Sequence, residues 1–189
     1  MTTGCANIDM AKAEERQREA WSARRSIEFR AGHGFDVHRF GPGDHVWLCG
    51  VCVPHGQGLI GHSDADVGLH ALTDALLGTI GAGDIGQHFP PSDPRWRGAA
   101  SSRFLTHAAG LINECGGQIM QVDVTLVCDQ PRIEPYRHAM IEGLARWLRL
   151  DRARCGVKAG STAGLGFTGR HEGIAATAVA IITLPAGRC

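Results

Sequence analysis

The stretch from residue 33 to residue 38 constrains the fold most, because its apolar and polar side chains alternate. Phe35 and Val37 alternate with Asp36 and His38. This period of two is typical of a strand, in which residues two apart share a face. The sequence therefore predicts a strand that presents a carboxylate and an imidazole side by side.

A predicted helix supplies a third group of the same chemistry. Apolar residues of 67–77 recur at helical spacing behind a polar loop, whose Ser or Asp at 63–64 suits a helix N-cap. Zinc accepts imidazole nitrogen and carboxylate oxygen, and three protein ligands leave one position open for a substrate. Asp36, His38 and His70 are therefore a candidate metal site, although an isolated Asp-x-His is more often a surface pair.

The remaining segments mix strands and helices without a strict βαβα order, which favours the α+β class. Pro135 suits the first turn of one of the helices. We expect a strand from Ile27 that turns at 41–44 into a hairpin with 46–53, helices over 67–78, 99–115 and 134–150, and strands over 119–127, 155–159 and 174–184.

Length and charge narrow the class of protein. A chain of 189 residues suits one compact domain. Residues 1–27 form a polar extension, expected as an exposed helix or a disordered tail, and 28–189 form the domain. Acidic and basic residues balance at nineteen each, which argues against nucleic acid or an anionic membrane surface as the partner.

Cysteine usage and hydropathy indicate a cytoplasmic protein. The seven cysteines are odd in number and scattered, and Cys49-x-x-Cys52 has no second pair with which to form a zinc ribbon. Reduced, mostly buried thiols are expected. No apolar run approaches the roughly 20 residues that span a bilayer, and no signal-peptide core follows the N-terminus.

Several separated blocks carry a family resemblance. They occur in order at 32–38, 61–64, 69–78, 83–86, 121–125, 157–159 and 165–170. Together they closely resemble the 2-C-methyl-D-erythritol 2,4-cyclodiphosphate synthases of the non-mevalonate isoprenoid pathway. The likeness runs from about Arg30 to Leu184, and many blocks in the correct order are more specific than one short motif.

The resemblance implies an activity and an architecture. The family cyclises 4-diphosphocytidyl-2-C-methyl-D-erythritol 2-phosphate to the 2,4-cyclodiphosphate and releases CMP, which is phosphorus–oxygen lyase chemistry. For this chain it implies a mixed β-sheet with helices on one side and a homotrimer with sites between subunits. It also implies zinc at Asp36, His38 and His70, with magnesium or manganese bridging the substrate phosphates.

The resemblance further implies roles for individual residues. His62 and Ser161 correspond to catalytic positions, with the Ser161 hydroxyl as a stabiliser of the transition state. Asp84 corresponds to a carboxylate that binds the methylerythritol hydroxyls, although alone it would pass for a helix cap. The substrate-binding positions are Asp36, His38, His62, Ser63, Asp84, Ile85, Gly86, Phe89, Ser92, Asp93, Phe167 and Arg170. The nucleotide-binding positions are Cys128, Asp129, Gln130, Pro131, Arg132, Ile133, Ala159, Gly160, Ser161 and Thr162.

One departure from the family pattern matters most, because it removes a carboxylate. The family reads Lys-Ala-Thr-Thr-Thr-Glu where residues 158–163 read Lys-Ala-Gly-Ser-Thr-Ala, so Ala163 replaces a Glu that ligates the second cation. Magnesium would then rely on phosphate oxygens and water, and we expect weaker cation dependence or lower turnover. Two alternatives stay open: a zinc-containing homologue that binds a cytidine nucleotide or an isoprenoid without turnover, and a zinc hydrolase.

The other histidines and three of the tryptophans are expected to be structural or exposed, since they recur at no ligand-binding spacing. They are His33, His45, His55, His88, His107, His138, His171, Trp47, Trp96 and Trp147.

Overall fold

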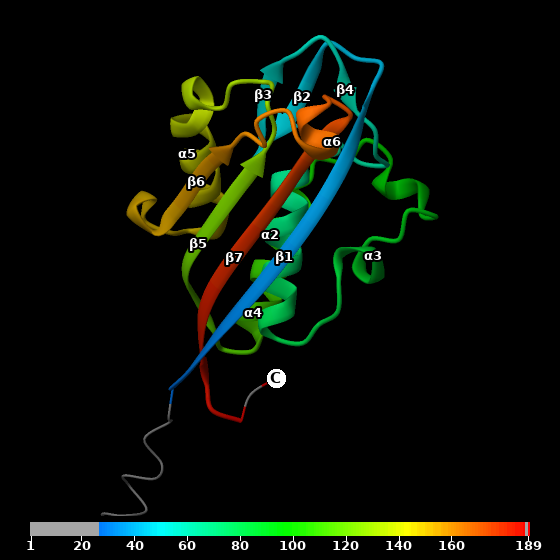
Figure 1. Cartoon of the computed structure of the whole chain (residues 1–189). Helices are drawn as coiled ribbons and strands as arrows, with labels where there is room; N and C mark the ends of the chain where they lie inside the picture. Colours follow the sequence, from blue (N-terminus) through cyan, green and yellow to red (C-terminus); the bar gives the residue numbers. More distant parts are fainter. Residues whose placement is uncertain (1–26, 188) are drawn as a thin grey trace, which may run out of the picture.

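A five-stranded mixed sheet forms the framework of the protein. The computed structural model describes residues 27–187 and 189, so the predicted extension at 1–27 lies outside the described residues except for its last position. The strand order is β4-β1-β7-β5-β6 (Figure 1), with β5 and β6 parallel and the other neighbours antiparallel. The strands are β1 (Ile27–Gly41), β4 (Gly58–Leu59), β5 (Gln118–Val127), β6 (Cys155–Gly160) and β7 (Gly173–Pro185).

Helices cover one face of this sheet, and Figure 1 views the sheet from the other face. The longest are α2 (Val67–Thr79), α4 (Ser102–Glu114) and α5 (Arg137–Leu148). Shorter ones are α3 (Ile85–His88), α6 (Gly166–Gly169) and the 3-10 turns η1 (Pro94–Trp96), η2 (Glu134–Tyr136) and η3 (Arg152–Arg154). The predicted α+β class, with a mixed sheet and helices on one side, is confirmed.

Two glycines of β1 set the position of α2. A β-carbon on Gly32 would overlap the carbonyl oxygen of Ala75, and one on Gly34 would overlap that of Ala71. Only hydrogen fits in this space, so the helix backbone can rest directly on the strand. This close approach brings the first turns of α2 next to the middle of β1.

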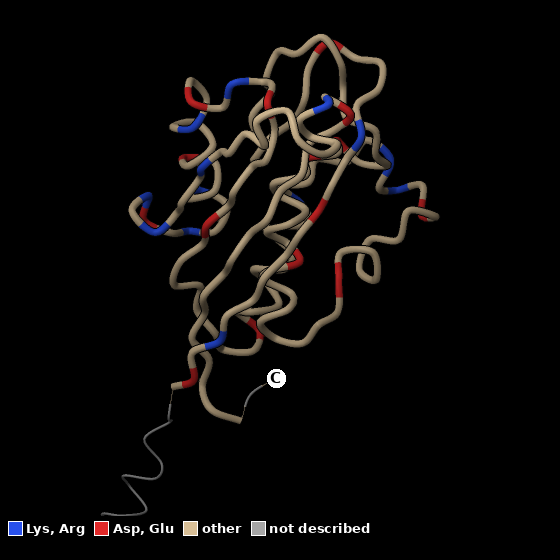
Figure 2. The backbone as a smooth tube through the Cα atoms, in the orientation of Figure 1, with Lys and Arg blue, Asp and Glu red and all other residues tan. Residues whose placement is uncertain are grey.

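The core lies between the sheet and the helices. Its fully buried large side chains include Leu69, Leu72, Leu76, Leu105, Ile112, Leu126, Met140, Leu144, Ile174 and Ile182. The opposite face of the sheet exposes large apolar side chains along β1 and β7, and no described element covers it: Phe29 is 72% exposed and Phe35 58%. The central strand β7 carries no charged residue (Figure 2).

The predicted hairpin between the first strand and 46–53 is wrong. β2 (His45–Leu48) and β3 (Val51–Pro54) pair only with each other within the described chain, while β1 pairs with β4 and β7. The turn between β2 and β3 uses positive φ values at Cys49 and Gly50, 47° and 77°. The buried Asp66 carboxylate accepts hydrogen bonds from both of their backbone N–H groups and anchors this turn to the start of α2.

Other boundaries shifted by a few residues. The N-cap of α2 is Asp66, which accepts a hydrogen bond from Leu69 N, and not a residue at 63–64 as predicted. The predicted helix over 134–150 begins as the 3-10 turn η2 and ends when Arg149 adopts a left-handed conformation. Local turns and capping decide these ends, and periodicity does not register them.

The expectation that the cysteines are all reduced is wrong for one pair. Cys115, at the end of α4, forms a disulfide with Cys189. These residues are 74 positions apart, so no local spacing could indicate the pairing. Cys49, Cys128 and Cys155 are free and buried, as expected, whereas free Cys52 is exposed.

Candidate metal centre and nucleotide cleft

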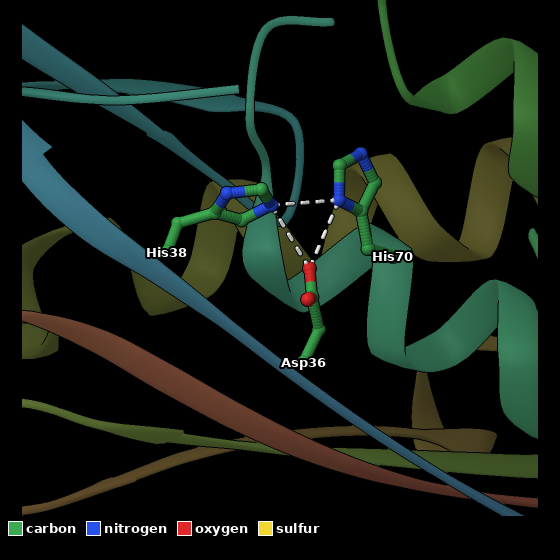
Figure 3. A group of neighbouring side chains, drawn as sticks. All are labelled: Asp36, His38 and His70. Atoms are coloured by element: carbon green, nitrogen blue, oxygen red, sulfur yellow. Dashed lines mark hydrogen bonds and ion pairs between the residues drawn. The ribbon is translucent and has the colours of Figure 1, made fainter. Parts of the chain in front are cut away.

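Asp36 and His38 on β1 and His70 on α2 point toward one another (Figure 3). Asp36 Oδ2 lies 3.0 Å from His38 Nε2 and 3.0 Å from His70 Nδ1, and the two nitrogens are 3.0 Å apart. Ligand atoms around tetrahedral zinc are roughly 3.3 Å apart, given bonds of about 2.0–2.1 Å. The three groups that the sequence singled out therefore fit one divalent cation.

A backbone carbonyl fixes the tautomer of His38. Its Nδ1 lies 2.8 Å from the carbonyl oxygen of Ile60. Because a carbonyl only accepts, Nδ1 carries the proton, and the lone pair of Nε2 faces Asp36 and His70.

Two serines fix the opposite tautomer of His70. Its Nε2 lies 2.8 Å from Ser101 Oγ and 3.0 Å from Ser63 Oγ. The Ser101 hydroxyl donates its own proton to Asp64, so it accepts from Nε2–H of His70. Nδ1 of His70 is thus left with a lone pair directed at the metal position. The sequence indicated Ser63 but gave no sign of Ser101, which reaches the site from the start of another helix.

Charge and hydrogen bonds from the two histidines keep the Asp36 carboxyl ionised, which is the form that binds a cation. Burial raises the pKa of the Asp36 carboxyl, but hydrogen bonds and charge from His38 and His70 outweigh it and hold the pKa well below its ordinary value. Burial lowers the pKa of His38, and Asp36 raises it further than burial lowers it. A cation must therefore compete with a proton on the histidine, which makes metal affinity fall with acidification.

The metal centre forms one wall of a pocket of about 540 Å³. Eight predicted site residues line it: Asp36, His38, His62, Ser63, His70, Ile85, Gly86 and Phe89. Asp84 and Asp93 instead cap helices next to the pocket, where Asp84 accepts a hydrogen bond from Gln87 N and Asp93 from Arg95 N. Further lining comes from Ile60, Gly61, Pro91, Trp96 and Phe104.

An aromatic wall, of which the sequence indicated only Phe89, faces the metal centre. The ring of Phe89 lies 4.4 Å from that of Phe104 and 5.0 Å from that of Trp96, between centroids. Phe104 also lies 6.0 Å from the imidazole of His70. Trp96, expected as a packing or surface residue, packs against these rings and also lines the pocket. Its position in an irregular Pro-rich segment offered no periodicity to read.

The predicted nucleotide-binding segments meet where the parallel strands β5 and β6 end. Cys128 N donates to Gly160 O at 3.1 Å, and the Ser161 hydroxyl donates to Asp129 Oδ1 at 2.6 Å. The two segments enclose a cleft of about 250 Å³. Gln130 is among the residues that line an adjoining cleft of about 600 Å³. The smaller cleft is lined by Cys128, Asp129, Pro131, Arg132, Ile133, Glu134, Arg137, Ala159, Gly160 and Ser161.

The metal centre and this cleft lie on different strands of one chain. The centre belongs to β1 and the cleft to β5 and β6, with β7 between β1 and β5. His62 and Ser161 are accordingly in different pockets. Phe167 lies in α6, and Arg170 just after it pairs with Glu172 at 2.9 Å.

The fold and the site define an α+β domain with an Asp-His-His centre for a divalent metal beside a substrate-sized pocket. The chain belongs to the YgbB family, whose sequence model matches residues 29–183. This agrees with the family indicated by the order of the sequence blocks.

Known relatives are similar over most of the chain. It is 59% identical over 157 residues to a bifunctional enzyme IspD/IspF of Caulobacter vibrioides, covering 83% of this chain and 41% of the relative. With the enzyme of the same description from Rhodospirillum rubrum, the identity is 61% over 158 residues, covering 84% and 41%. The chain thus spans about two fifths of the length of these curated relatives.

Solved structures show the same fold. The bifunctional IspDF from Campylobacter jejuni superposes with a TM-score of 0.81 at 38% identity, covering 84% of this chain and 43% of that one. A 2C-methyl-D-erythritol-2,4-cyclodiphosphate synthase superposes with a TM-score of 0.75 at 41% identity, covering 81% and 99%. Among the described residues, the structure contains no helix with the length and apolarity that a membrane crossing requires.

Proposed function

We propose that this chain cyclises 4-diphosphocytidyl-2-C-methyl-D-erythritol 2-phosphate to 2-C-methyl-D-erythritol 2,4-cyclodiphosphate and releases CMP, as a phosphorus–oxygen lyase. The observation that carries the proposal is the convergence of Asp36, His38 and His70 at one wall of the pocket, in a member of this family. A synthase described as bound to CDP is 40% identical and has the same fold, which supports a cytidine diphosphate group in the substrate.

Asp36, His38 and His70 would hold zinc or a similar divalent metal. When bound, such a cation supplies a Lewis acid that offsets negative charge on a phosphate oxygen. The protein's own task is positioning, because attack of one phosphate on another requires two anions to be held in line. His62 and Ser63 line the pocket beside the metal ligands and would orient the phosphates.

The other half of the pocket suits the methylerythritol group. Phe89, Trp96 and Phe104 would exclude water from the carbon skeleton. Asp84 Oδ1 caps α3, whereas among the described residues Oδ2 accepts only a long hydrogen bond of 3.5 Å from Gln87 Nε2, and we assign Oδ2 to a substrate hydroxyl. Ser92 and Asp93 follow Phe89 on the same segment and would close over the ligand.

The cleft at the ends of β5 and β6 would hold the cytidine. Its backbone groups at 128–133 and 159–162 would bind cytosine, and Arg132 would offset phosphate charge. Ser161 would stabilise the transition state, with Asp129 orienting its hydroxyl. We place Phe167 and Arg170 at the substrate side or at a subunit boundary.

A homotrimer would unite the two parts of the site. The pocket and the cleft lie apart on one chain, and the uncovered sheet face exposes Phe29, Phe35 and Val179 by 72%, 58% and 42%. Burying such a face between copies is favourable, at roughly 25 cal/mol per Å² of apolar surface. The proposed assembly has each Ser161 complete the metal pocket of a neighbouring subunit.

Magnesium or manganese would bridge the substrate phosphates with little help from this chain. Ala163 offers no side-chain oxygen at the family's Glu position. We therefore propose a weaker dependence on the second cation than the family shows. A cytoplasmic location stays a prediction from composition.

The decisive experiment is product analysis. Purified full-length protein supplied with zinc and magnesium is incubated with the diphosphocytidyl substrate, and the expected products are CMP and the cyclic diphosphate. CMP with a linear phosphate would identify a hydrolase, and binding without products a non-catalytic homologue. The variant His70→Asn should lose activity, whereas His138→Asn, which alters an exposed histidine on α5, should retain it.

A further inference from the structure

Two imidazoles meet beside the pocket without belonging to the metal centre. His88 is the last residue of α3, and His107 lies on α4. Nδ1 of His88 is 3.3 Å from Nε2 of His107, with ring centroids 5.3 Å apart and ring planes at 60°. The proposed reaction assigns neither side chain a role.

The tautomer of His88 is set by the backbone. Its Nε2 lies 2.8 Å from the carbonyl oxygen of Ala82, so Nε2 carries the proton. Nδ1 therefore presents its lone pair toward His107. A histidine whose second nitrogen donates to a carbonyl is the usual arrangement of a metal-ligating imidazole, since the bond fixes the ring.

The separation of the two nitrogens fits a shared cation. Zinc bonds of about 2.0–2.1 Å in tetrahedral geometry place neighbouring ligand atoms roughly 3.3–3.4 Å apart. The 3.3 Å between His88 Nδ1 and His107 Nε2 matches this spacing, so one cation can reach both nitrogens in place of the proton that a direct N–H···N hydrogen bond would share.

The surroundings leave one side open to solvent and one side apolar. The ring of Phe89 lies 5.2 Å from that of His107, and His107 is itself exposed, so water can complete the coordination. Arg103, one turn earlier on α4, has its guanidinium over the ring of Trp96 at 5.4 Å. This cation–π contact holds the positively charged guanidinium of Arg103 against the ring of Trp96.

We propose that His88 and His107 form a second site for a divalent cation of zinc, nickel or copper type, completed by water. Because α3 also supplies Ile85 and Gly86 to the pocket, a cation here would fasten that wall to α4. Imidazole ligands favour these metals over magnesium or calcium, which prefer oxygen. The proposal stands on the fold alone and does not require the cyclisation.

Titration of the metal-free full-length protein with zinc tests this site. Calorimetry should show two binding events per chain, a tight one at Asp36, His38 and His70 and a weaker one. His107→Asn and, separately, His88→Asn should weaken the second event at least tenfold and leave the first unchanged. His138→Asn alters another exposed histidine and is the matched control, so it should leave both binding events unchanged.

A single event in the parent protein, or a second event that survives both variants, would overturn the proposal. Once the first site is saturated, additional zinc should raise the melting temperature of the parent protein further. That additional rise should vanish in both variants, and their melting temperatures without zinc should equal the parent's. A variant that loses stability even without zinc would assign the pair a packing role and reject the site.

Discussion

The hydroxyl of Ser101 lies 2.8 Å from Nε2 of His70 and holds that imidazole with its other nitrogen toward the metal centre. Removing such an outer partner typically costs 10–100-fold in metal affinity, because the ligand ring is no longer oriented. We therefore expect Ser101→Ala to weaken zinc binding roughly 10–100-fold. Competition with a chromogenic chelator measures this.

The neighbouring residue provides the control for that experiment. Ser102→Ala alters the first residue of α4, whose carbonyl, not its hydroxyl, is engaged with Thr106. Its zinc affinity should equal the parent's. Equal affinities for both variants would mean that Ser63 alone orients His70.

The close contact of β1 and α2 yields a second prediction. Gly34→Ala places a methyl group against the carbonyl oxygen of Ala71, so the helix must move away from the strand. Overpacking of this kind costs about 1–3 kcal/mol of unfolding free energy. Since the helix carries His70, zinc affinity should fall together with stability in denaturant titrations.

Gly78→Ala is the matched control, because an added β-carbon there meets nothing within 4 Å. Gly78 lies in the same helix, where replacing glycine with alanine stabilises by about 0.5–1 kcal/mol. Unfolding free energy should therefore rise and zinc affinity stay constant. A destabilised Gly78→Ala would show that helix packing, not overlap at Gly34, limits this region.

The sequence predicted the convergence of Asp36, His38 and His70 because each belongs to a strongly periodic segment. A period of two placed Asp36 and His38 on one face of β1, and helical spacing placed His70 on α2. Such patterns show which side chains are buried together. Asp36, His38 and His70 lie at the edge of the buried region that these patterns predict. The family blocks added the identities of residues in both clefts.

What the sequence could not give were contacts made by irregular or distant segments. Trp96 reaches the pocket from a turn, Ser101 reaches His70 from a helix start, and the Cys115–Cys189 disulfide joins distant positions. The β2–β3 pairing depends on Asp66, whose carboxylate holds a turn 16 residues away in sequence. Local patterns contain no information on such long-range hydrogen bonds.

Asp66 gives a third prediction, on pH. Burial raises the pKa of its carboxyl from 3.8 to about 6, despite hydrogen bonds from Gly50, Leu69 and Cys49. A raised acid pKa means that the folded state favours the protonated form. Its contribution to stability is therefore full below about pH 4 and is lost as the pH rises through 6, by about 3 kcal/mol.

Asp66→Asn should flatten this part of the pH profile. The amide oxygen can still accept from Cys49 N and Leu69 N, but the amide nitrogen would face the N–H of Gly50. An unsatisfied donor costs about 1–3 kcal/mol, so the variant should be less stable than the parent at pH 4 and closer to it at pH 7. Urea unfolding at both values measures the difference, and parallel profiles would contradict it.

Asp44→Asn controls for the general effect of losing one carboxylate. Asp44 is exposed, and His45 lowers its pKa by a hydrogen bond and by charge. Its replacement should leave the rise in stability between pH 7 and pH 4 intact. If that rise disappears in this variant as well, it cannot be attributed to Asp66.

Ala163 gives the final prediction, on the magnesium or manganese ion that we propose bridges the substrate phosphates. Its backbone N–H lies 2.9 Å from Ser161 Oγ, so a longer side chain here would start beside the proposed nucleotide cleft. Ala163→Glu should lower the magnesium concentration for half-maximal CMP release by roughly tenfold, because one carboxylate joins the phosphate and water ligands. Ala163→Gln provides the same length without charge and should behave like the parent. Both replacements adopt the φ of 54° already present at Ala163, so backbone strain is common to them. An equal magnesium response in the two variants would mean that side-chain charge at this position does not reach the bridging cation.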